Sequence, residues 1–325
     1  MHLLNQIRSP LIRANTLSIY ASQLPAEALI HLRGQNIPAF LQGQLTCDTR
    51  KLSPTQAVSG AFCNVKGRVI SDVDVIQRNE AHCLLRVRRS VALGFAAALQ
   101  RYAQFSRISV EVDQRSDALQ GVYTPLTGDE QAFAGLPIGA LSPGHIDVCD
   151  DTVYFQRNDQ QVELIGLLGR PRTPAGCAPG TEQAWRMQLL RSGHFSVEQE
   201  DSEAFTPQTL NYDLSGLVAF DKGCYTGQEV IARLHYKGKS KRRLQIYSCV
   251  MPALAAKRDD PISGTDGRAI GRVLCVETSA GEAAVLAAEV LAAELGAPAQ
   301  LSTGGELSPL TPLSHFPNQS PKTQQ

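Results

Sequence analysis

Alternating apolar and polar positions predict strands in the first third of the chain. Residues 69–75 and 83–87 alternate in this way, which is the period of a half-buried strand. Ser90 is a candidate N-cap, and apolar residues then recur every three or four positions over 91–105, which predicts a helix. Period two returns over 108–112. This order predicts an α+β unit whose helix packs on a mostly antiparallel sheet.

A similar but weaker pattern follows. Residues 153–155 alternate and 162–168 form a short apolar run, so both are predicted as strands. A loop rich in Pro and Gly over 170–180 precedes Thr181, the candidate cap of a helix that carries Trp185. We therefore expect two related, ferredoxin-like α+β units rather than one large fold.

The last third of the chain has a different pattern. Residues 244–250 and 269–276 are predicted as strands separated by Pro, Gly and Asp turns, which suits a small β-barrel. Ala, Leu and Glu favour a helix over Ala283–Val290, but the neighbouring strands favour a strand, which we predict. A Pro-, Ser- and Gln-rich end is expected to be a poorly ordered tail. The predicted units are 1–115 (α+β), 116–229 (α+β), 230–302 (barrel) and 303–325 (tail).

Composition narrows the class of protein. Lys and Arg total 31, as do Asp and Glu, so the formal net charge is zero and a globally basic nucleic-acid binder is excluded. The sequence shows neither an apolar run of about 18 residues nor a signal peptide, so we expect a cytoplasmic protein without a membrane span. The eight cysteines include no Cys-x-x-Cys pair. This argues against a disulfide framework and against a local metal site, and no metal ligand is predicted.

One run of residues indicates chemistry, Asp221-Lys222-Gly223-Cys224-Tyr225-Thr226-Gly227-Gln228-Glu229. Lys222 precedes Cys224 by two residues, and a nearby cation favours the thiolate, which is the reactive form of cysteine. We predict Cys224 as the functional thiol and Lys222 as the group that activates it. The alternative is a structural cysteine buried in a turn.

The neighbours of Cys224 are predicted to shape its turn. Gly223 and Gly227 permit positive φ or close backbone approach. Tyr225 lies inside the turn, and Gln228 and Glu229 are expected to fix it by hydrogen bonds while a helix begins there. The positive end of that helix would further favour an anion.

Lys-Gly-Cys-Tyr-Thr-Gly-Gln-Glu resembles the signature of the YgfZ-type folate-binding proteins, relatives of the glycine-cleavage T-protein (an aminomethyltransferase). Further segments are similar to that family in the same order over about residues 15–302: Leu41–Asp48, Phe62–Arg68, Phe205–Gln208 and Lys241–Leu244. The resemblance implies two T-protein-like units and a barrel. It also implies a folate pocket between the domains and a role in maintaining iron–sulfur enzymes, notably those that thiolate tRNA.

The resemblance also points to folate-binding residues. Trp185 is similar in context to a family tryptophan and could stack on a pterin or aminobenzoate ring; the alternative is a core aromatic. Asp72 falls where relatives carry a catalytic aspartate on the pterin side of the site. Asp74 lies on the same face of the strand as Asp72. The alternative is that both aspartates lie on a solvent-exposed face. Arg191 and Phe195 depart from the aminomethyltransferase pattern of glutamate and proline. A carboxylate that would grip the pterin is therefore missing, and Arg191 is expected to weaken folate binding or to meet the polyglutamate tail.

A run of cations follows the cysteine motif. No Asp or Glu occurs over 230–258, and six cations fall within eleven residues: Arg233, Lys237, Lys239, Lys241, Arg242 and Arg243. They could attract tRNA phosphates, the folate tail or an acidic partner, with Tyr236 available for base stacking. The alternative is a solvated strand and turn.

We therefore predict a folate-binding accessory factor for iron–sulfur enzymes and tRNA thiolation, with its thiol at Cys224. The expected partners are folate, iron–sulfur tRNA-modifying enzymes or assembly proteins and, weakly, tRNA. One alternative is a tetrahydrofolate-dependent one-carbon transferase. Asp72 favours it, whereas the Lys222–Tyr225 run, Arg191 and Phe195 disfavour it. Another alternative is a non-catalytic RNA- or partner-binding module.

Overall fold

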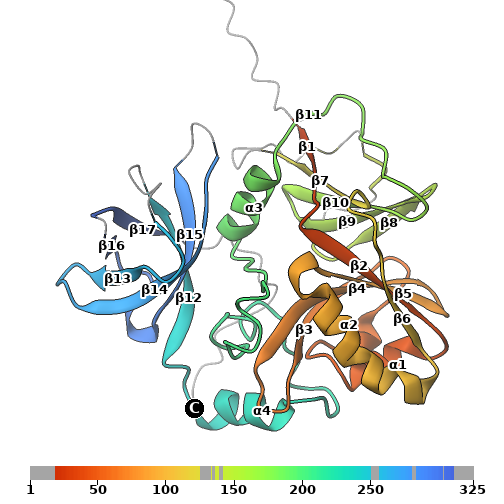
Figure 1. The fold of residues 1–325 in the computed structure, drawn as a ribbon, viewed down its shortest axis with the longest axis horizontal. Helices are drawn as coiled ribbons and strands as arrows, with labels where there is room; N and C mark the ends of the chain where they lie inside the picture. The colour runs from red at the N-terminus through yellow and green to blue at the C-terminus, as the bar shows by residue number, and fades with distance from the viewer. Residues whose placement is uncertain are drawn as a thin grey trace, which may run out of the picture.

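The computed structural model describes residues 19–124, 133, 136–138, 142–249, 256–279, 283–302 and 304–310. It contains two antiparallel-rich sheets and a closed barrel (Figure 1). The predicted α+β class with a C-terminal β-barrel is confirmed.

The first sheet has five strands in the order β3-β4-β5-β2-β6. These are β2 (Glu27–Arg33), β3 (Val58–Cys63), β4 (Val69–Asn79), β5 (His82–Arg88) and β6 (Ser109–Val112). Helix α2 (Arg89–Ala103) covers one face with Val91, Phe95 and Leu99, which are all buried. Ser90 is not its N-cap: the helix begins one residue earlier, and the Ser90 hydroxyl donates a hydrogen bond to the Glu198 carboxylate instead.

The second sheet has six strands in the order β11-β1-β7-β10-β9-β8. These are β1 (Tyr20–Gln23), β7 (Leu119–Tyr123), β8 (Ile146–Cys149), β9 (Thr152–Asn158), β10 (Gln161–Gly166) and β11 (Ala178–Pro179). Helix α3 (Glu182–Arg191) follows, and its predicted cap is confirmed because Thr181 Oγ1 accepts a hydrogen bond from the Ala184 N–H (3.1 Å). Because β1 pairs with β7, residues 20–23 belong to the second sheet and not to the unit expected over 1–115.

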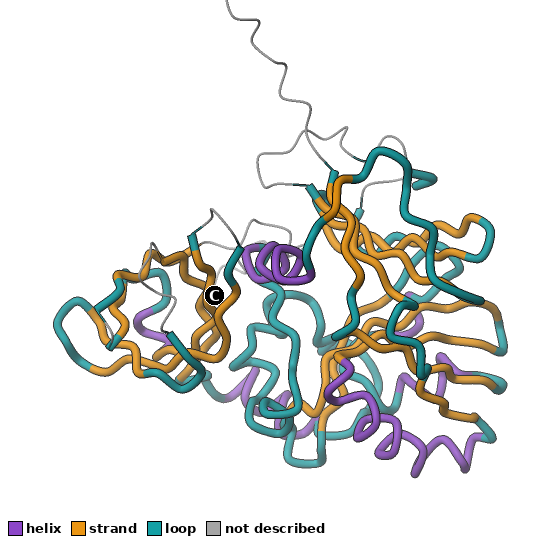
Figure 2. The backbone as a smooth tube through the Cα atoms, turned by 45° about the horizontal axis from the view of Figure 1, so that its top comes forward, coloured by secondary structure: helices purple, strands orange, loops and turns teal. Residues whose placement is uncertain are grey.

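The two sheets face each other, as the tube in Figure 2 shows. Leu29, Ile76 and Leu84 from the first sheet share a buried cluster with Phe155 and Ile165 from the second. The face of the first sheet opposite α2 is therefore also buried, which places its polar residues inside the molecule.

The barrel closes in the order β12-β15-β14-β13-β16-β17. Its strands are β12 (Arg242–Cys249), β13 (Pro261–Gly264), β14 (Ala269–Glu277), β15 (Ala284–Leu291), β16 (Ala299–Leu301) and β17 (Glu306–Leu310). The strand predicted over Ala283–Val290 is confirmed by β15, where pairing with β12 and β14 overrides local helix propensity. β17 falls inside the expected tail, so the barrel continues beyond residue 302; Leu307 is buried there although its neighbours are polar. Residues 311–325 of that predicted tail lie outside the described residues.

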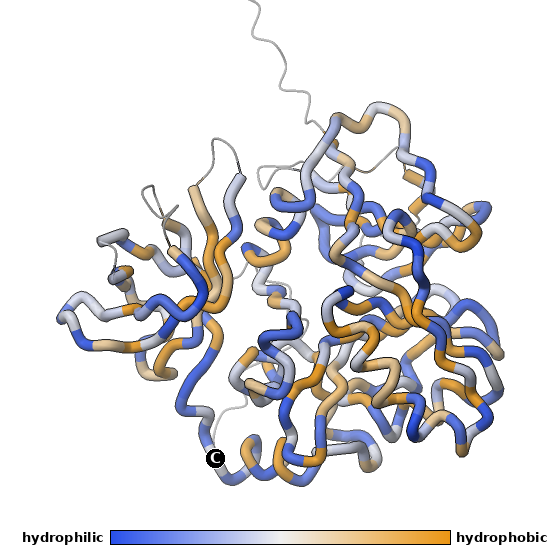
Figure 3. The backbone as a smooth tube through the Cα atoms, viewed as in Figure 1, coloured by the Kyte–Doolittle hydropathy of each residue, from blue (hydrophilic) through white to orange (hydrophobic). Residues whose placement is uncertain are grey.

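Helix α3 lies between the barrel and the second sheet (Figure 1). Two short elements, α1 (Ile37–Gln42) and α4 (Gln228–Lys237), lie near the cysteine motif. The barrel was expected to begin at residue 230. Helix α4 occupies the start of that segment, and the first barrel strand begins at Arg242. Figure 3 shows the link between α4 and β12 as a hydrophilic stretch. Among the described residues, no helix has the length and apolar character needed to cross a membrane.

Candidate functional site

A cavity of about 550 Å³ lies between the two sheets, with β4 on one wall and β9 on another. This volume falls within the roughly 300–1,000 Å³ typical of small-molecule sites. Its walls combine apolar and polar side chains, among them Ser59, Asp74, Phe155, Gln156, Arg157, Leu189, His194, Phe195, Tyr212 and Leu217. Such a lining suits a flat, partly polar ligand.

Asp74 supplies the carboxylate of this cavity. Ser59 Oγ donates to its Oδ1 (2.5 Å), and Arg157 donates to its Oδ2. Burial alone would raise the pKa of Asp74, but the guanidinium groups of Arg157 and Arg86 lower it to about 2. Asp74 therefore stays ionised, as one half of an ion pair with Arg157 on the cavity wall.

Asp72 has a different environment, although it shares a strand face with Asp74. It does not line the cavity; its Oδ1 accepts a hydrogen bond from the Val197 N–H (2.7 Å), and its Oδ2 lies 3.8 Å from His194 Nε2. Burial raises the pKa of Asp72 to about 6, whereas burial and Arg157 lower the pKa of His194 to about 3. Asp72 thus anchors the 194–197 segment, and Asp74 is the cavity acid.

We expect Asp72→Asn to flatten the pH dependence of unfolding between about pH 4 and pH 6. A raised folded-state pKa means that the native protein binds more protons in this window, so its stability falls as pH rises. The slope should lessen by up to ~1.4 kcal/mol per pH unit, measured by urea unfolding across this range. Asp74→Asn is the control, because the lowered pKa of Asp74 gives a contribution of opposite sign that falls between about pH 2 and pH 4, below this window; the same change in both variants would contradict the assignment.

Trp185 lies in the core and not on the cavity wall. Its exposed fraction is 0%, and it packs edge-on to Tyr123. A Cβ added at Gly121 would lie 2.5 Å from Trp185 Cε3, so this glycine makes room for the indole. The core-aromatic alternative is the one that the geometry favours.

The two departures from the family pattern also have defined places. Arg191 lies in the last turn of α3, is half-buried and is not among the residues that line the cavity. Phe195 is buried and contributes an apolar part of the wall. A cation at the cavity comes instead from Arg157 and Lys51, neither of which the motif comparison indicated.

Cys224 is exposed on the loop between Phe220 and α4. Lys222, predicted to activate it, is buried, and its Nζ donates to three backbone carbonyls: Gln42 O (2.8 Å), Leu45 O (2.7 Å) and Cys47 O (2.6 Å). Burial lowers the pKa of Lys222 to about 8. Lys222 therefore anchors the loop to the 42–47 segment. The thiol on which its charge acts is that of Cys47, whose pKa it lowers against the effect of burial.

The rest of the loop is fixed mainly by backbone contacts. Tyr225 is buried with its ring 4.9 Å from Lys222 Nζ, and the Gln228 N–H donates to Tyr225 O (3.2 Å). Gly227 has φ +84°, and a Cβ there would lie 2.5 Å from Asn64 O, so glycine is required. Gly223 has ordinary φ and open space around it, and is not required.

Gln228 and Glu229 form the first turn of α4. The structure gives neither side chain a hydrogen bond to a described residue, so the turn is held without the side-chain bonds that we predicted. The thiol of Cys224 thus projects from a loop anchored at Lys222, Tyr225 and Gly227.

The predicted cations divide into two groups. Arg243 pairs with Asp213 (2.8 Å) and donates to Gln208 O (3.0 Å), so it attaches β12 to the 208–213 segment. The others are exposed on α4, on the link that follows it and at the start of β12: Arg233, Lys237, Lys239, Lys241 and Arg242.

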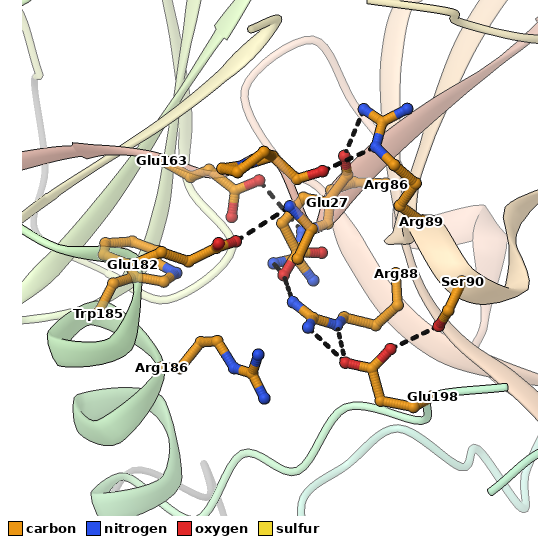
Figure 4. Close-up of polar contacts among 12 residues, drawn as sticks. Glu27, Arg86, Arg88, Arg89, Ser90, Glu163, Glu182, Trp185, Arg186 and Glu198 are labelled. Carbon is orange, nitrogen blue, oxygen red and sulfur yellow. Dashed lines mark hydrogen bonds and ion pairs between the residues drawn. The ribbon is translucent and has the colours of Figure 1, made fainter. Parts of the chain in front are cut away.

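Sequence reasoning missed a buried ionic cluster between the sheets (Figure 4). Arg86 is fully buried and lies 3.1 Å from Glu163 Oε1 and 3.0 Å from Glu27 Oε1. Arg88 pairs with Glu27 and with Glu198. Only the alternation of β5, which places Arg86 and Arg88 on one face, hinted at it.

Cys47 was also missed, although it lies in a segment that resembles the family. It lines the cavity, and burial raises the pKa of its thiol to about 12, so it stays protonated. Among the described residues, no three His, Cys, Asp or Glu side chains are placed to hold a metal ion.

The fold is of the aminomethyltransferase type. The crystal structure of glycine cleavage system aminomethyltransferase T from Bartonella henselae matches with a TM-score of 0.69 at 17% identity, over 91% of this chain and 86% of that one. At this identity the likeness concerns the fold alone. No protein-family model matches the chain.

Among curated proteins, the chain is similar to the tRNA-modifying protein YgfZ. The Vibrio atlanticus protein is 29% identical over 226 residues, which are 67% of this chain and 66% of that protein. The Edwardsiella ictaluri protein is 28% identical over 252 residues, which are 72% of each. The resemblance deduced from the cysteine motif is confirmed, and the chain spans about two thirds of the Vibrio relative.

Proposed function

We propose that this protein is an accessory factor of tRNA modification that binds a folate in the central cavity and presents the Cys224 thiol to iron–sulfur enzymes. The observation that carries the proposal is an exposed thiol on a loop that three carbonyl bonds of Lys222 hold in place. An exposed cysteine between buried anchors suits contact with a partner. The names of the relatives support a tRNA-modification role, and the iron–sulfur part rests on the resemblance alone.

The cavity residues fit a folate. Gln156 is 1% exposed, and its Oε1 has no hydrogen-bond partner among the described residues, although it lines the cavity. A pterin has N–H groups that would donate hydrogen bonds to this oxygen and to the Asp74 carboxylate. Phe155 and Phe195 would pack against its ring. Lys51 would meet a glutamate carboxylate. The bound folate would supply one-carbon or redox chemistry, while these residues bind and orient it.

The aminomethyltransferase fold supports a second candidate, folate-dependent one-carbon transfer. The aspartate that the resemblance assigns to this reaction, Asp72, instead accepts a hydrogen bond from Val197 and lies off the cavity. We therefore rank this function second. An assay for methylene transfer to tetrahydrofolate by the purified protein separates the two, since an accessory factor should show no turnover.

The main test is complementation. In a bacterial strain that lacks its own YgfZ, expression of this chain should restore methylthiolated nucleosides, measured by mass spectrometry of hydrolysed tRNA. A soluble, expressed protein that restores none of them would refute the tRNA-modification role.

Folate binding is tested by calorimetric titration with tetrahydrofolate. Asp74→Asn should weaken binding at least about tenfold, because a charge-assisted hydrogen bond contributes roughly 1.5–3 kcal/mol. Asp72→Asn, two residues away, should leave the Kd within about twofold; Gln156→Leu provides a second cavity variant that alters no charge. Equal effects at both aspartates, or unchanged affinity in Asp74→Asn, would contradict the assignment of the cavity.

A further inference from the structure

Aromatic and basic side chains are concentrated in and around helix α4, which follows the Cys224 loop. We call this group of side chains the α4 face, and define it by Phe220, Arg233, His235, Tyr236, Lys237, Lys239, Lys241 and Arg242. It comprises Phe220, residues of helix α4, the hydrophilic link to β12 that Figure 3 shows and the first residue of β12.

The aromatic part is ordered by ring contacts. Phe220 and His235 stack with centroids 3.7 Å apart and an interplanar angle of 16°. Tyr236 contacts both rings edge-on, at 6.1 Å from Phe220 and 4.8 Å from His235, yet it is 68% exposed. A large aromatic ring held by its neighbours and open to solvent is a ready platform for another flat ring.

The basic part consists of five exposed side chains. Arg233, Lys237, Lys239, Lys241 and Arg242 are exposed, and none forms an ion pair with a described residue. Arg243, the next residue in the chain, differs from them because it forms an ion pair with Asp213 and so has a structural role. Five exposed cations beside an exposed aromatic ring are complementary to a polyanion that carries rings.

The α4 face contacts the start of the Cys224 loop. Phe220 directly precedes the 221–227 loop, and its ring stacks on His235 in the last turn of α4. A chain bound across Tyr236 and the lysines would therefore pass close to this loop.

We propose that the α4 face binds a single-stranded segment of RNA, with a base stacked on Tyr236 and phosphates on Lys237, Lys239 and their neighbours. Stacking combined with a basic track is how proteins hold unpaired nucleotides. An acidic protein would satisfy the cations but would not use the exposed ring. The choice of RNA among polyanions rests on the proposed role in tRNA modification.

The test is fluorescence anisotropy of the full chain with a labelled single-stranded RNA of roughly 12 nucleotides. Tyr236→Ala should weaken binding about tenfold, and Tyr236→Phe should retain it because the ring remains. Lys237→Gln/Lys239→Gln should weaken binding and lower the salt dependence (log Kd against log salt) by about 1.4, at ~0.7 per phosphate contact. Arg101→Gln/Lys257→Gln, which removes two exposed cations elsewhere, is the matched control.

Three results would overturn the proposal: no RNA binding by the wild-type chain, equal weakening by the control, or equal affinities of the Tyr236→Ala and Tyr236→Phe variants. Heparin, a polyanion without bases, should bind Tyr236→Ala and wild type alike; a matching loss there would show that the ring acts structurally. Failure here leaves tRNA methylthiolation by the wild-type chain unaffected, so it is distinguishable from failure of the proposed function.

Discussion

Replacing Cys224 by alanine is expected to reduce methylthiolated tRNA nucleosides to the level of a strain that carries no copy of the protein. The thiol is the one reactive group that the anchored loop exposes, and alanine cannot replace its nucleophilicity or its ligand character. The free energy of unfolding should stay within about 0.5 kcal/mol of wild type, because the side chain is exposed. Complementation and urea unfolding of the same variant check the two statements together.

Cys149→Ala is the matched control, because Cys149 is also an exposed free cysteine but lies at the end of β8. It should complement fully. Wild-type methylthiolation with Cys224→Ala would remove Cys224 from the proposed function. A large loss of stability in that variant would instead make the cysteine structural.

Arg86→Met is expected to destabilise the protein by roughly 3–5 kcal/mol, the usual cost of removing one partner from a buried ion pair. The methionine would fill most of the space, but Glu27 and Glu163 would each lose one of the cations that compensate their burial, keeping only Arg88 and Arg157 respectively. Denaturant unfolding at neutral pH measures the loss. Arg101→Met, on the exposed side of α2, should change stability by less than about 0.5 kcal/mol.

The loss of unfolding free energy in Arg86→Met should become smaller as pH falls. Burial already raises the pKa of Glu163 against the influence of Arg86 and Arg157. Without Arg86 this pKa rises further, so the variant gains stability as Glu163 takes up a proton. A double variant, Arg86→Met/Glu163→Gln, should recover part of the loss by removing one uncompensated charge. If the loss of stability were independent of pH and the same in the double variant, the contribution of Arg86 would come from its packing and not from its charge.

Both predictions concern sites whose residue type is visible in the sequence but whose environment is not. The Cys224 motif identified the resemblance, yet its lysine serves as an anchor, because the carbonyls of 42–47 come from a distant segment. Asp72 and Asp74 are equivalent by alternation. Only the tertiary structure separates them, because β9 of the opposite sheet brings Arg157 to Asp74, whereas the segment after α3 brings the Val197 N–H to Asp72.

The sequence by itself determined what depends on neighbours along the chain. The alternation of β4 and β5, the capped helix after Thr181, the uniformly basic run after Glu229 and the family resemblance all follow from local pattern. Only the tertiary structure decided what depends on distant segments. It placed β1 in the second sheet, buried Trp185 against Gly121 and enclosed Arg86 between two glutamates. The physical reason is that the burial and charge environment of a side chain are set by whatever packs on it, and spacing along the chain does not encode which segments meet.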